Sequence, residues 1–168
     1  MKSVATIKIR DAEAAEVETL AKLWHDAWHE AHASIVPPEL TRMRTLQNFT
    51  TRMREALDRT RVAGAPDRPG GFCIIKGDEL DHLFVALHAR GSGAAAALLA
   101  DAEARLAAAG VRLAWLACAI GNERAARFYE KSGWRRSGVF VHHPETPDGK
   151  LTMEAWRYEK RLRASILR

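Results

Sequence analysis

The chain has 168 residues, of which 47% are apolar and 28% are charged, and its net charge is +5 at pH 7. This balance is typical of globular proteins and excludes a disordered chain, and the length favours a single domain over residues 1–168. No apolar run approaches the roughly 20 residues that a membrane-spanning helix needs, and Met1–Arg10 does not have the pattern of a signal peptide. We therefore expect a soluble, cytoplasmic protein with no membrane partner.

Hydrophobic periodicity predicts strands and helices along the whole chain. Alternating or continuous apolar runs predict strands over residues 4–10, 60–63, 72–76, 80–87, 111–120, 134–142 and 151–161. Helical spacing or strong helix formers predict helices over residues 12–33, 37–57, 94–109 and 122–132. Asp11 and Asn122 are candidate N-caps, and Gly77–Asp78 is a candidate hairpin turn. The order β-α-α-β-β-β-α-β-α-β-β predicts a mixed α/β fold.

The two cysteines, Cys73 and Cys118, both lie in apolar runs. This placement predicts buried, reduced thiols, because neither a disulfide framework nor a zinc-ligand spacing is present.

Part of the positive charge lies in the second predicted helix, in Arg42, Arg44, Arg52 and Arg54. We expect these side chains on a solvated face. Aromatic residues are not interleaved with the basic ones and no nucleic-acid-binding motif is present, which argues against a nucleic-acid partner.

The segment Val85–Ala95 joins the end of a strand, a glycine-bearing turn and the start of a helix. Glycines at 91 and 93 allow a tight turn, and the first helical turn has free N–H groups at the positive end of the helix dipole. Such a turn is suited to a pyrophosphate, to which Arg90 can add a charge-assisted hydrogen bond. By itself, however, an ordinary glycine-rich strand–helix turn explains the segment equally well.

A second motif begins at Asn122 and reads Asn-Glu-Arg-Ala-Ala-Arg-Phe-Tyr-Glu-Lys-Ser-Gly-Trp. Together the two motifs resemble the GNAT acetyltransferases. Arg90-x-x-Gly93-x-Ala95 is similar to their R/Q-x-x-G-x-G/A pyrophosphate loop, and the second motif is similar to their N-x-x-A-x-x-F-Y-E-K-x-G-F. The similarity covers nearly the whole chain. It implies a mixed, mostly antiparallel sheet of about seven strands flanked by four helices.

The resemblance implies acetyl-CoA as co-substrate and no metal. It places the pantetheine between the strands predicted over residues 80–87 and 111–120. The implied cofactor-binding residues are Leu83, Phe84, Val85, Arg90, Gly91, Ser92, Gly93, Ala94, Ala95, Ala96, Asn122 and Tyr129. Tyr129 is also the implied general acid for the leaving thiolate, since its phenol can donate a proton. Direct attack by the amine needs no cysteine nucleophile, although Cys118 lies near the thioester path and leaves a covalent route open.

The general base departs from the family pattern. Many relatives carry a glutamate five residues before the motif asparagine, and here that position is Ala117. Asp81 and His82 are the principal candidates that remain, together with Glu79 and a base acting through water. Strand alternation places Asp81 and His82 on opposite faces unless a β-bulge changes the register.

Three histidines, His25, His29 and His32, share one face of the first predicted helix. Solvent exposure or lining of the acceptor cleft is favoured over a metal site. Trp24 and Trp28 are expected in the core, with a wall of the acceptor pocket as the alternative. We expect His142 and His143 to be exposed near a turn.

Two functions of different classes fit these observations. The first is an N-acetyltransferase that transfers an acetyl group from acetyl-CoA to a primary amine of a small molecule or peptide. The second is a non-catalytic CoA-binding regulatory module, which Ala117 suggests and Tyr129 opposes. The basic surface admits a variant of the first, an enzyme acting on ribosomal or tRNA-linked amines. A homodimer is left open, because members of this family are often dimers.

Overall fold

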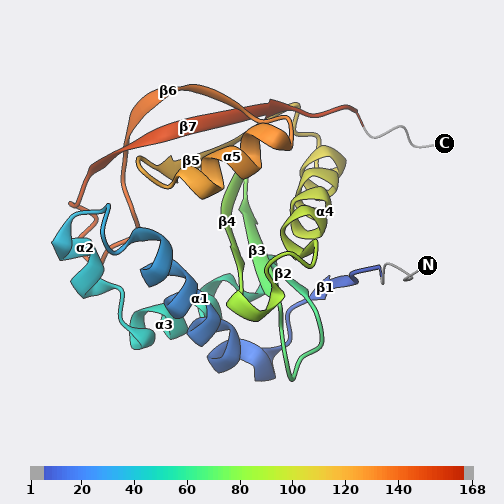
Figure 1. Cartoon of the computed structure of the whole chain (residues 1–168), viewed down its shortest axis with the longest axis horizontal. Coiled ribbons are helices and arrows are strands. Elements are labelled where there is room, and N and C mark those ends of the chain that lie inside the picture. The colour runs from blue at the N-terminus through green and yellow to red at the C-terminus, as the bar shows by residue number, and fades with distance from the viewer. Residues whose placement is uncertain (1–5, 165–168) are drawn as a thin grey trace.

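The structure is a computed structural model, and it describes residues 6–164. A seven-stranded sheet in the order β1-β2-β3-β4-β5-β7-β6 forms its centre (Figure 1). Neighbouring strands are antiparallel except β4 and β5, which are parallel. The strands are β1 (Ile9–Asp11), β2 (Thr60–Ala63), β3 (Gly71–Lys76), β4 (Glu79–Val85), β5 (Leu113–Ala119), β6 (Arg135–His142) and β7 (Met153–Arg161). The predicted mixed, mostly antiparallel sheet is therefore confirmed.

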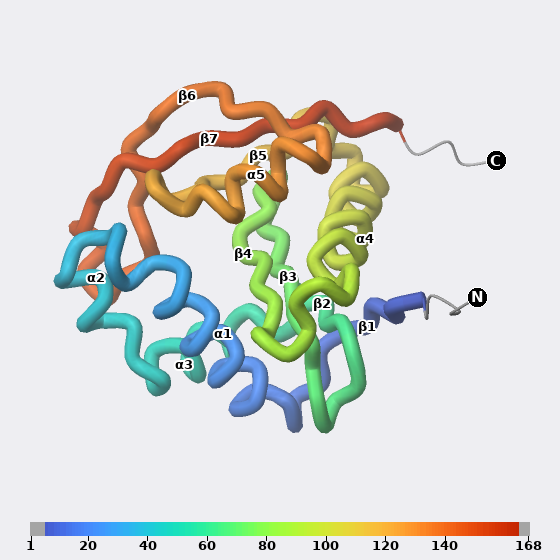
Figure 2. Tube along the Cα trace, in the orientation of Figure 1, coloured from blue at the N-terminus to red at the C-terminus, as the bar shows by residue number. Residues whose placement is uncertain are grey.

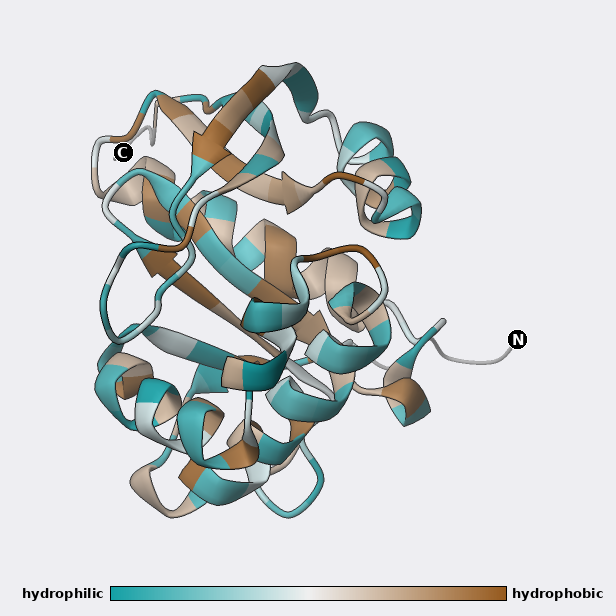
Figure 3. Ribbon diagram, turned by 90° about the vertical axis from the view of Figure 1, so that its left-hand side faces the viewer, coloured by the Kyte–Doolittle hydropathy of each residue, from teal (hydrophilic) through white to brown (hydrophobic). Residues whose placement is uncertain are grey.

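Helices cover both faces of this sheet. Within residues 6–164 the α-helices are α1 (Val17–His32), α2 (Pro38–Met43), α3 (Leu46–Ala56), α4 (Ala94–Ala108) and α5 (Glu123–Lys131). One apolar core joins α1 and α3 to the sheet, and a second core joins α4 and α5 to the opposite face. Hydrophobic residues accordingly concentrate in the strands, while much of the helical surface is hydrophilic (Figure 3).

The N-terminal elements differ from the sequence prediction in two places. The second predicted helix is divided into α2 and α3, because Thr45 begins a new helix and its side chain accepts a hydrogen bond from the amide of Asn48. Asp11 is not a cap but the last residue of β1, and Glu13 and Glu16 form the capping box of the turn before α1. Part of the strand predicted over residues 4–10 lies outside the described residues.

Two irregularities in the middle of the sheet create the space for a site. Strands β4 and β5 form a single paired position, Glu79 with Trp115, and then diverge. In the β3–β4 ladder His82 pairs with Ile74 and Leu80 pairs with Ile75, so Asp81 has no partner and forms a β-bulge. Because of this bulge, the simple alternation of Asp81 and His82 between two faces does not hold.

The β6–β7 hairpin arches over β5 and α5, and its turn reaches the region of α2 (Figure 2). Residues distant in sequence meet there, since the Arg52 Nε of α3 donates to the Glu145 carboxylate of the β6–β7 connection at 3.3 Å. This connection closes one side of the space left by β4 and β5. No helix in the described part of the chain is long and apolar enough to cross a membrane.

Candidate active site

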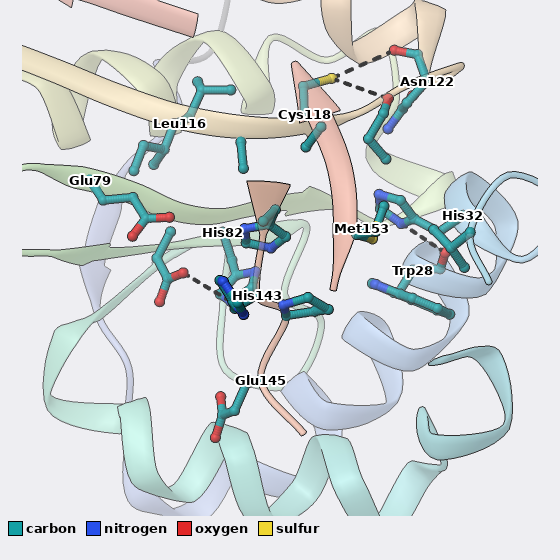
Figure 4. A pocket seen from close by; sticks show the side chains of 18 of the residues that line it. Trp28, His32, Glu79, His82, Leu116, Cys118, Asn122, His143, Glu145 and Met153 are labelled. Atoms are coloured by element: carbon teal, nitrogen blue, oxygen red, sulfur yellow. Dashed lines mark hydrogen bonds and ion pairs between the residues drawn. The ribbon is translucent and has the colours of Figure 1, made fainter. Parts of the chain in front are cut away.

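A cavity of about 660 Å³ lies where β4 and β5 diverge. Its walls come from α1, α2, α3, the N-terminal turn of α5 and the β6–β7 connection, as well as from the two strands (Figure 4). The lining includes several predicted site residues, namely Asp81, His82, Leu83, Phe84, Asn122 and Tyr129. The structure therefore brings the predicted catalytic residues and part of the predicted cofactor-binding set into one cavity.

The predicted phosphate loop forms a tight turn into α4. Gly91 and Gly93 have φ values of 75° and 92°, in the left-handed region that favours glycine, and Gly93 is the N-cap of the helix. The Ser92 hydroxyl accepts a hydrogen bond from the Ala94 amide at 3.3 Å. The next two amides, of Ala95 and Ala96, have no hydrogen-bond acceptor within the described part of the chain. The start of this helix can therefore bind an anion.

Arg90, predicted to bind phosphate, is engaged elsewhere. Its guanidinium donates to both carboxylate oxygens of Glu30 on α1, at 2.8 and 2.5 Å. The same carboxylate lies 3.6 Å from the Arg124 guanidinium. A ligand phosphate at the α4 N-terminus would therefore compete with Glu30 for Arg90.

Tyr129 lies on α5 with its ring between two other aromatic side chains, Trp134 and Tyr158, with centroids 6.1 and 6.2 Å away. Only 8% of the residue is exposed, and this burial raises the pKa of its phenol above the usual value of 10. The phenol is therefore protonated at neutral pH and can act as a proton donor. Asn122 caps the same helix through its side-chain oxygen, which accepts from the Ala125 amide, as predicted.

The candidate bases lie together on β4. His82 Nε2 is 3.4 Å from Asp81 Oδ1, and the His82 ring packs against Trp24 with 4.8 Å between ring centroids. Burial, together with the nearby arginines 52 and 44, lowers the pKa of His82 well below its ordinary value. Burial also raises the pKa of Asp81, and burial with repulsion from Asp81 raises the pKa of Glu79 to about 7. The cavity thus holds a neutral imidazole beside carboxyl groups of increased basicity.

Residues 20–134, more than half of the chain, match the family described as the Acetyltransferase (GNAT) family. The chain belongs to the GNAT family. An uncharacterized N-acetyltransferase of Mycobacterium bovis is 35% identical over 112 residues, which are 64% of this chain and 69% of that protein. This relative supports the same family membership.

Solved structures share the GNAT fold with this chain. A GCN5-related N-acetyltransferase from Rhodopseudomonas palustris has a TM-score of 0.73 and 19% identity, with 94% of this chain and 97% of that chain covered. The PaiA N-acetyltransferase of Thermoplasma acidophilum, solved in complex with coenzyme A, has a TM-score of 0.63 and 21% identity, with 93% and 99% covered. At these identities the likeness establishes the fold alone.

The cysteines of this GNAT chain are buried and unpaired, as predicted. Cys118 lines the cavity, and its thiol lies 3.8 Å from each of the carbonyl oxygens of Ala119 and Asn122. Burial raises the pKa of Cys118 to about 12 and that of Cys73 to about 11. A protonated thiol is a poor nucleophile, so the geometry does not favour the covalent alternative.

The three histidines on one face of α1 have different surroundings. His25 contacts Asp26, His29 Nε2 lies 2.6 Å from the Arg44 carbonyl oxygen, and no group of three metal-ligating side chains occurs within residues 6–164. Among the three, only His32 lines the cavity, beside Trp28, and burial lowers its pKa to about 4.

The remaining predictions concern two tryptophans and two histidines in or near the cavity wall. Trp24 is in the core as predicted, with 1% of its surface exposed, whereas Trp28 is both core and cavity wall. His142 is half-buried rather than exposed, while His143 is exposed, and both line the cavity.

The prediction that the arginines of the second helix are solvated is wrong for two of them. Arg42 and Arg54 are exposed, but Arg44 and Arg52 are only 3% and 6% exposed and line the cavity. A signal for Arg52 exists in the sequence, because it follows Phe49 at helical spacing and therefore falls on the apolar face of its helix. Arg44 has no such signal, since its burial depends on the break between α2 and α3.

Proposed function

We propose that this GNAT-family chain transfers an acetyl group from acetyl-CoA to a primary amine of a small molecule or peptide. The observation that carries the proposal is the buried, protonated phenol of Tyr129 in the cavity where β4 and β5 diverge. A proton donor at this position suits a reaction that expels a thiolate.

The residues present fit acetyl-CoA. The β5-facing edge of β4 beyond Glu79 has no strand partner, so the backbone of Leu83–Val85 is available to bind a pantetheine chain. The glycine turn at 91–93 and the amides that follow it suit a pyrophosphate, and Asn122 lies on the cavity wall. When bound, acetyl-CoA supplies a thioester carbonyl that an amine can attack. The CoA complex of PaiA supports this assignment.

Two side chains of the cavity would then transfer protons, one as acceptor and one as donor. Asp81, whose basicity is increased by burial and which lies 3.4 Å from His82, accepts the proton that the attacking amine loses. Tyr129 donates its proton to the sulfur as the carbon–sulfur bond breaks. A backbone N–H near Val85 stabilises the negative charge on the carbonyl oxygen, and both reactants are held in one cavity.

The substitution Tyr129→Phe tests this role. We expect kcat to fall about 100-fold, in the range measured for loss of a general acid, while the Kd of acetyl-CoA stays within two-fold of wild type. The assay measures CoA thiol release with a panel of small primary amines and short peptides. Tyr158→Phe is the matched control, because Tyr158 is buried but does not line the cavity.

The alternative, a non-catalytic CoA-binding regulatory module, predicts a different result. Such a protein binds acetyl-CoA yet releases no CoA with any member of the amine panel. That outcome, or a Tyr129→Phe variant as active as wild type, would contradict the proposed chemistry.

A further inference from the structure

The end of the cavity formed by α2, α3 and the β6–β7 connection contains two buried cations that the proposed transfer does not use. These are Arg44, directly after α2, and Arg52, on α3, which are 3% and 6% exposed. Both line the cavity beneath the connection that carries Glu145. We call this pair the arginine pair.

Neither arginine is fully satisfied by the protein. Arg44 Nη1 donates to Asn48 Oδ1 at 3.1 Å, and Arg52 Nε donates to Glu145 at 3.3 Å. Arg44 Nε and Arg52 Nη1 are buried, and within residues 6–164 they have no hydrogen-bond acceptor. Buried donors are nearly always paired in native proteins, so these two groups indicate that an acceptor comes from outside the chain.

The local charge is also unbalanced. Glu145 is the carboxylate that pairs with Arg52, and its own side chain is 62% exposed. Asp81 attracts Arg52 as well, but Lys76 and Arg59 act on the same carboxylate. The neighbouring histidines 32, 82 and 142 have lowered pKa values and are neutral at physiological pH. Burial and repulsion from Arg52 lower the pKa of Arg44 to about 10, despite the attraction of Glu145.

We propose that the acceptor amine also carries a carboxylate, as an amino acid or the C-terminus of a short peptide does, and that Arg44 and Arg52 bind this carboxylate. The inference rests on the proposed acetyl transfer. A carboxylate matches the planar fork of an arginine. The two arginines and Glu145 together leave one positive charge, which the single negative charge of a carboxylate balances. The carboxyl groups of Glu79 and Asp81, which also line the cavity, suit the amine of the same molecule.

Glu145 would compete with the substrate carboxylate for Arg52. It lies on an exposed connection and reaches Arg52 through one hydrogen bond of 3.3 Å. A substrate carboxylate at the arginine pair must share Arg52 with Glu145 or displace it. Removal of the Glu145 carboxylate should therefore strengthen binding of an anionic acceptor, whereas removal of either arginine should weaken that binding.

The experiment compares free amino acids with their α-amides and with the corresponding decarboxylated amines. The readout is the ratio of kcat/KM for the acid to kcat/KM for its amide, measured by CoA release. We expect a ratio of at least about 10 in wild type, a ratio near 1 in Arg52→Gln and in Arg44→Gln, and a ratio several-fold above wild type in Glu145→Gln. Arg54→Gln, an exposed arginine on the same helix, is the control and should keep the wild-type ratio.

A wild-type ratio near 1, or a ratio that neither Arg52→Gln nor Glu145→Gln changes, overturns the inference. A preference for aminoalkylphosphonates over the carboxylates overturns the choice of carboxylate. If an arginine variant does not fold, Glu145→Gln decides alone, because its carboxylate is largely exposed.

Thermal stabilisation by the same acids and amides separates this inference from the proposed function. One outcome is that the acid stabilises wild type but not Arg52→Gln, and that no CoA is released with any amine. This outcome supports the carboxylate site and contradicts the acetyl transfer. Turnover of the amides or decarboxylated amines, without stabilisation or turnover by any acid, contradicts the carboxylate site alone. Absence of both stabilisation and turnover with all of these amines contradicts both proposals.

Discussion

Glu79 lines the cavity and has a strongly raised pKa. It lies at the one point where β4 and β5 pair, and burial with repulsion from Asp81 raises its pKa to about 7. In the unfolded chain its pKa returns to about 4.5. The folded protein therefore holds this proton more tightly than the unfolded chain does, and stability decreases as pH rises between these two values.

The substitution Glu79→Gln should remove this loss of stability at high pH. We expect the variant to be more stable than wild type by about 1–3 kcal/mol near pH 8, and the difference to vanish at about pH 4, where the carboxyl group is protonated in both states. Urea unfolding at the two pH values measures it. Glu154→Gln, an exposed glutamate on β7, is the control. An equal difference at both pH values would show that the carboxyl group is not perturbed in the fold.

Among the elements, α1 is connected to the phosphate loop through one ion pair. Glu30 accepts two hydrogen bonds from Arg90, and the attraction of Arg90 lowers the pKa of Glu30, so the pair is ionised. The pair is partly exposed, with 30% of the arginine side chain and 47% of the glutamate side chain accessible. Partly exposed pairs contribute little to stability, so a ligand pyrophosphate can take Arg90 from Glu30 at low cost.

Glu30→Gln should therefore tighten acetyl-CoA binding. The expected gain is about two- to five-fold in Kd, which corresponds to the loss of one exposed ion pair, and it should diminish at high salt. Isothermal titration calorimetry measures the change. Glu18→Gln, on the same helix and without an ion pair in the described residues, should bind as wild type does. Weaker binding by Glu30→Gln would instead indicate that Glu30 orients Arg90 for the phosphate.

Local signals predicted some elements well and others poorly. The glycine turn at 91–93 and the cap at Asn122 depend on neighbouring residues only, so both were predictable from the sequence. The bulge at Asp81 depends on how β3 pairs with β4, and no local pattern encodes that register. For the same reason the sequence placed Asp81 and His82 on opposite faces only if no bulge intervened, and the structure, which has the bulge, places them side by side.

For the whole molecule, the order of strands and helices was predictable because hydrophobic periodicity marks the strands and helices along the chain. The lining of the cavity was less predictable, since it combines α1, α2, α3 and the β6–β7 connection. The burial of Arg44 and Arg52 follows from that assembly and from no single segment. The residues proposed to recognise the acceptor therefore come together through tertiary structure, whereas the glycine turn at 91–93 depends on local sequence.

The proposed acetyl-CoA site lies at the start of α4. Among the described residues, a Cβ at Gly93 would meet Ile7 alone, at 3.7 Å, so a side chain fits there, although the φ of 92° imposes some strain. Aspartate and asparagine tolerate this conformation similarly and differ in charge. The pair Gly93→Asp and Gly93→Asn therefore isolates the effect of a negative charge on pyrophosphate binding.

The decisive measurement is calorimetric titration of acetyl-CoA into wild type, Gly93→Asp and Gly93→Asn, each shown to be folded by circular dichroism. We predict that wild type binds and that Gly93→Asp binds at least about ten-fold more weakly than Gly93→Asn, because its carboxylate repels the pyrophosphate. Absence of binding to wild type, or equal affinities of the two variants, would contradict an acetyl-CoA site at the start of α4.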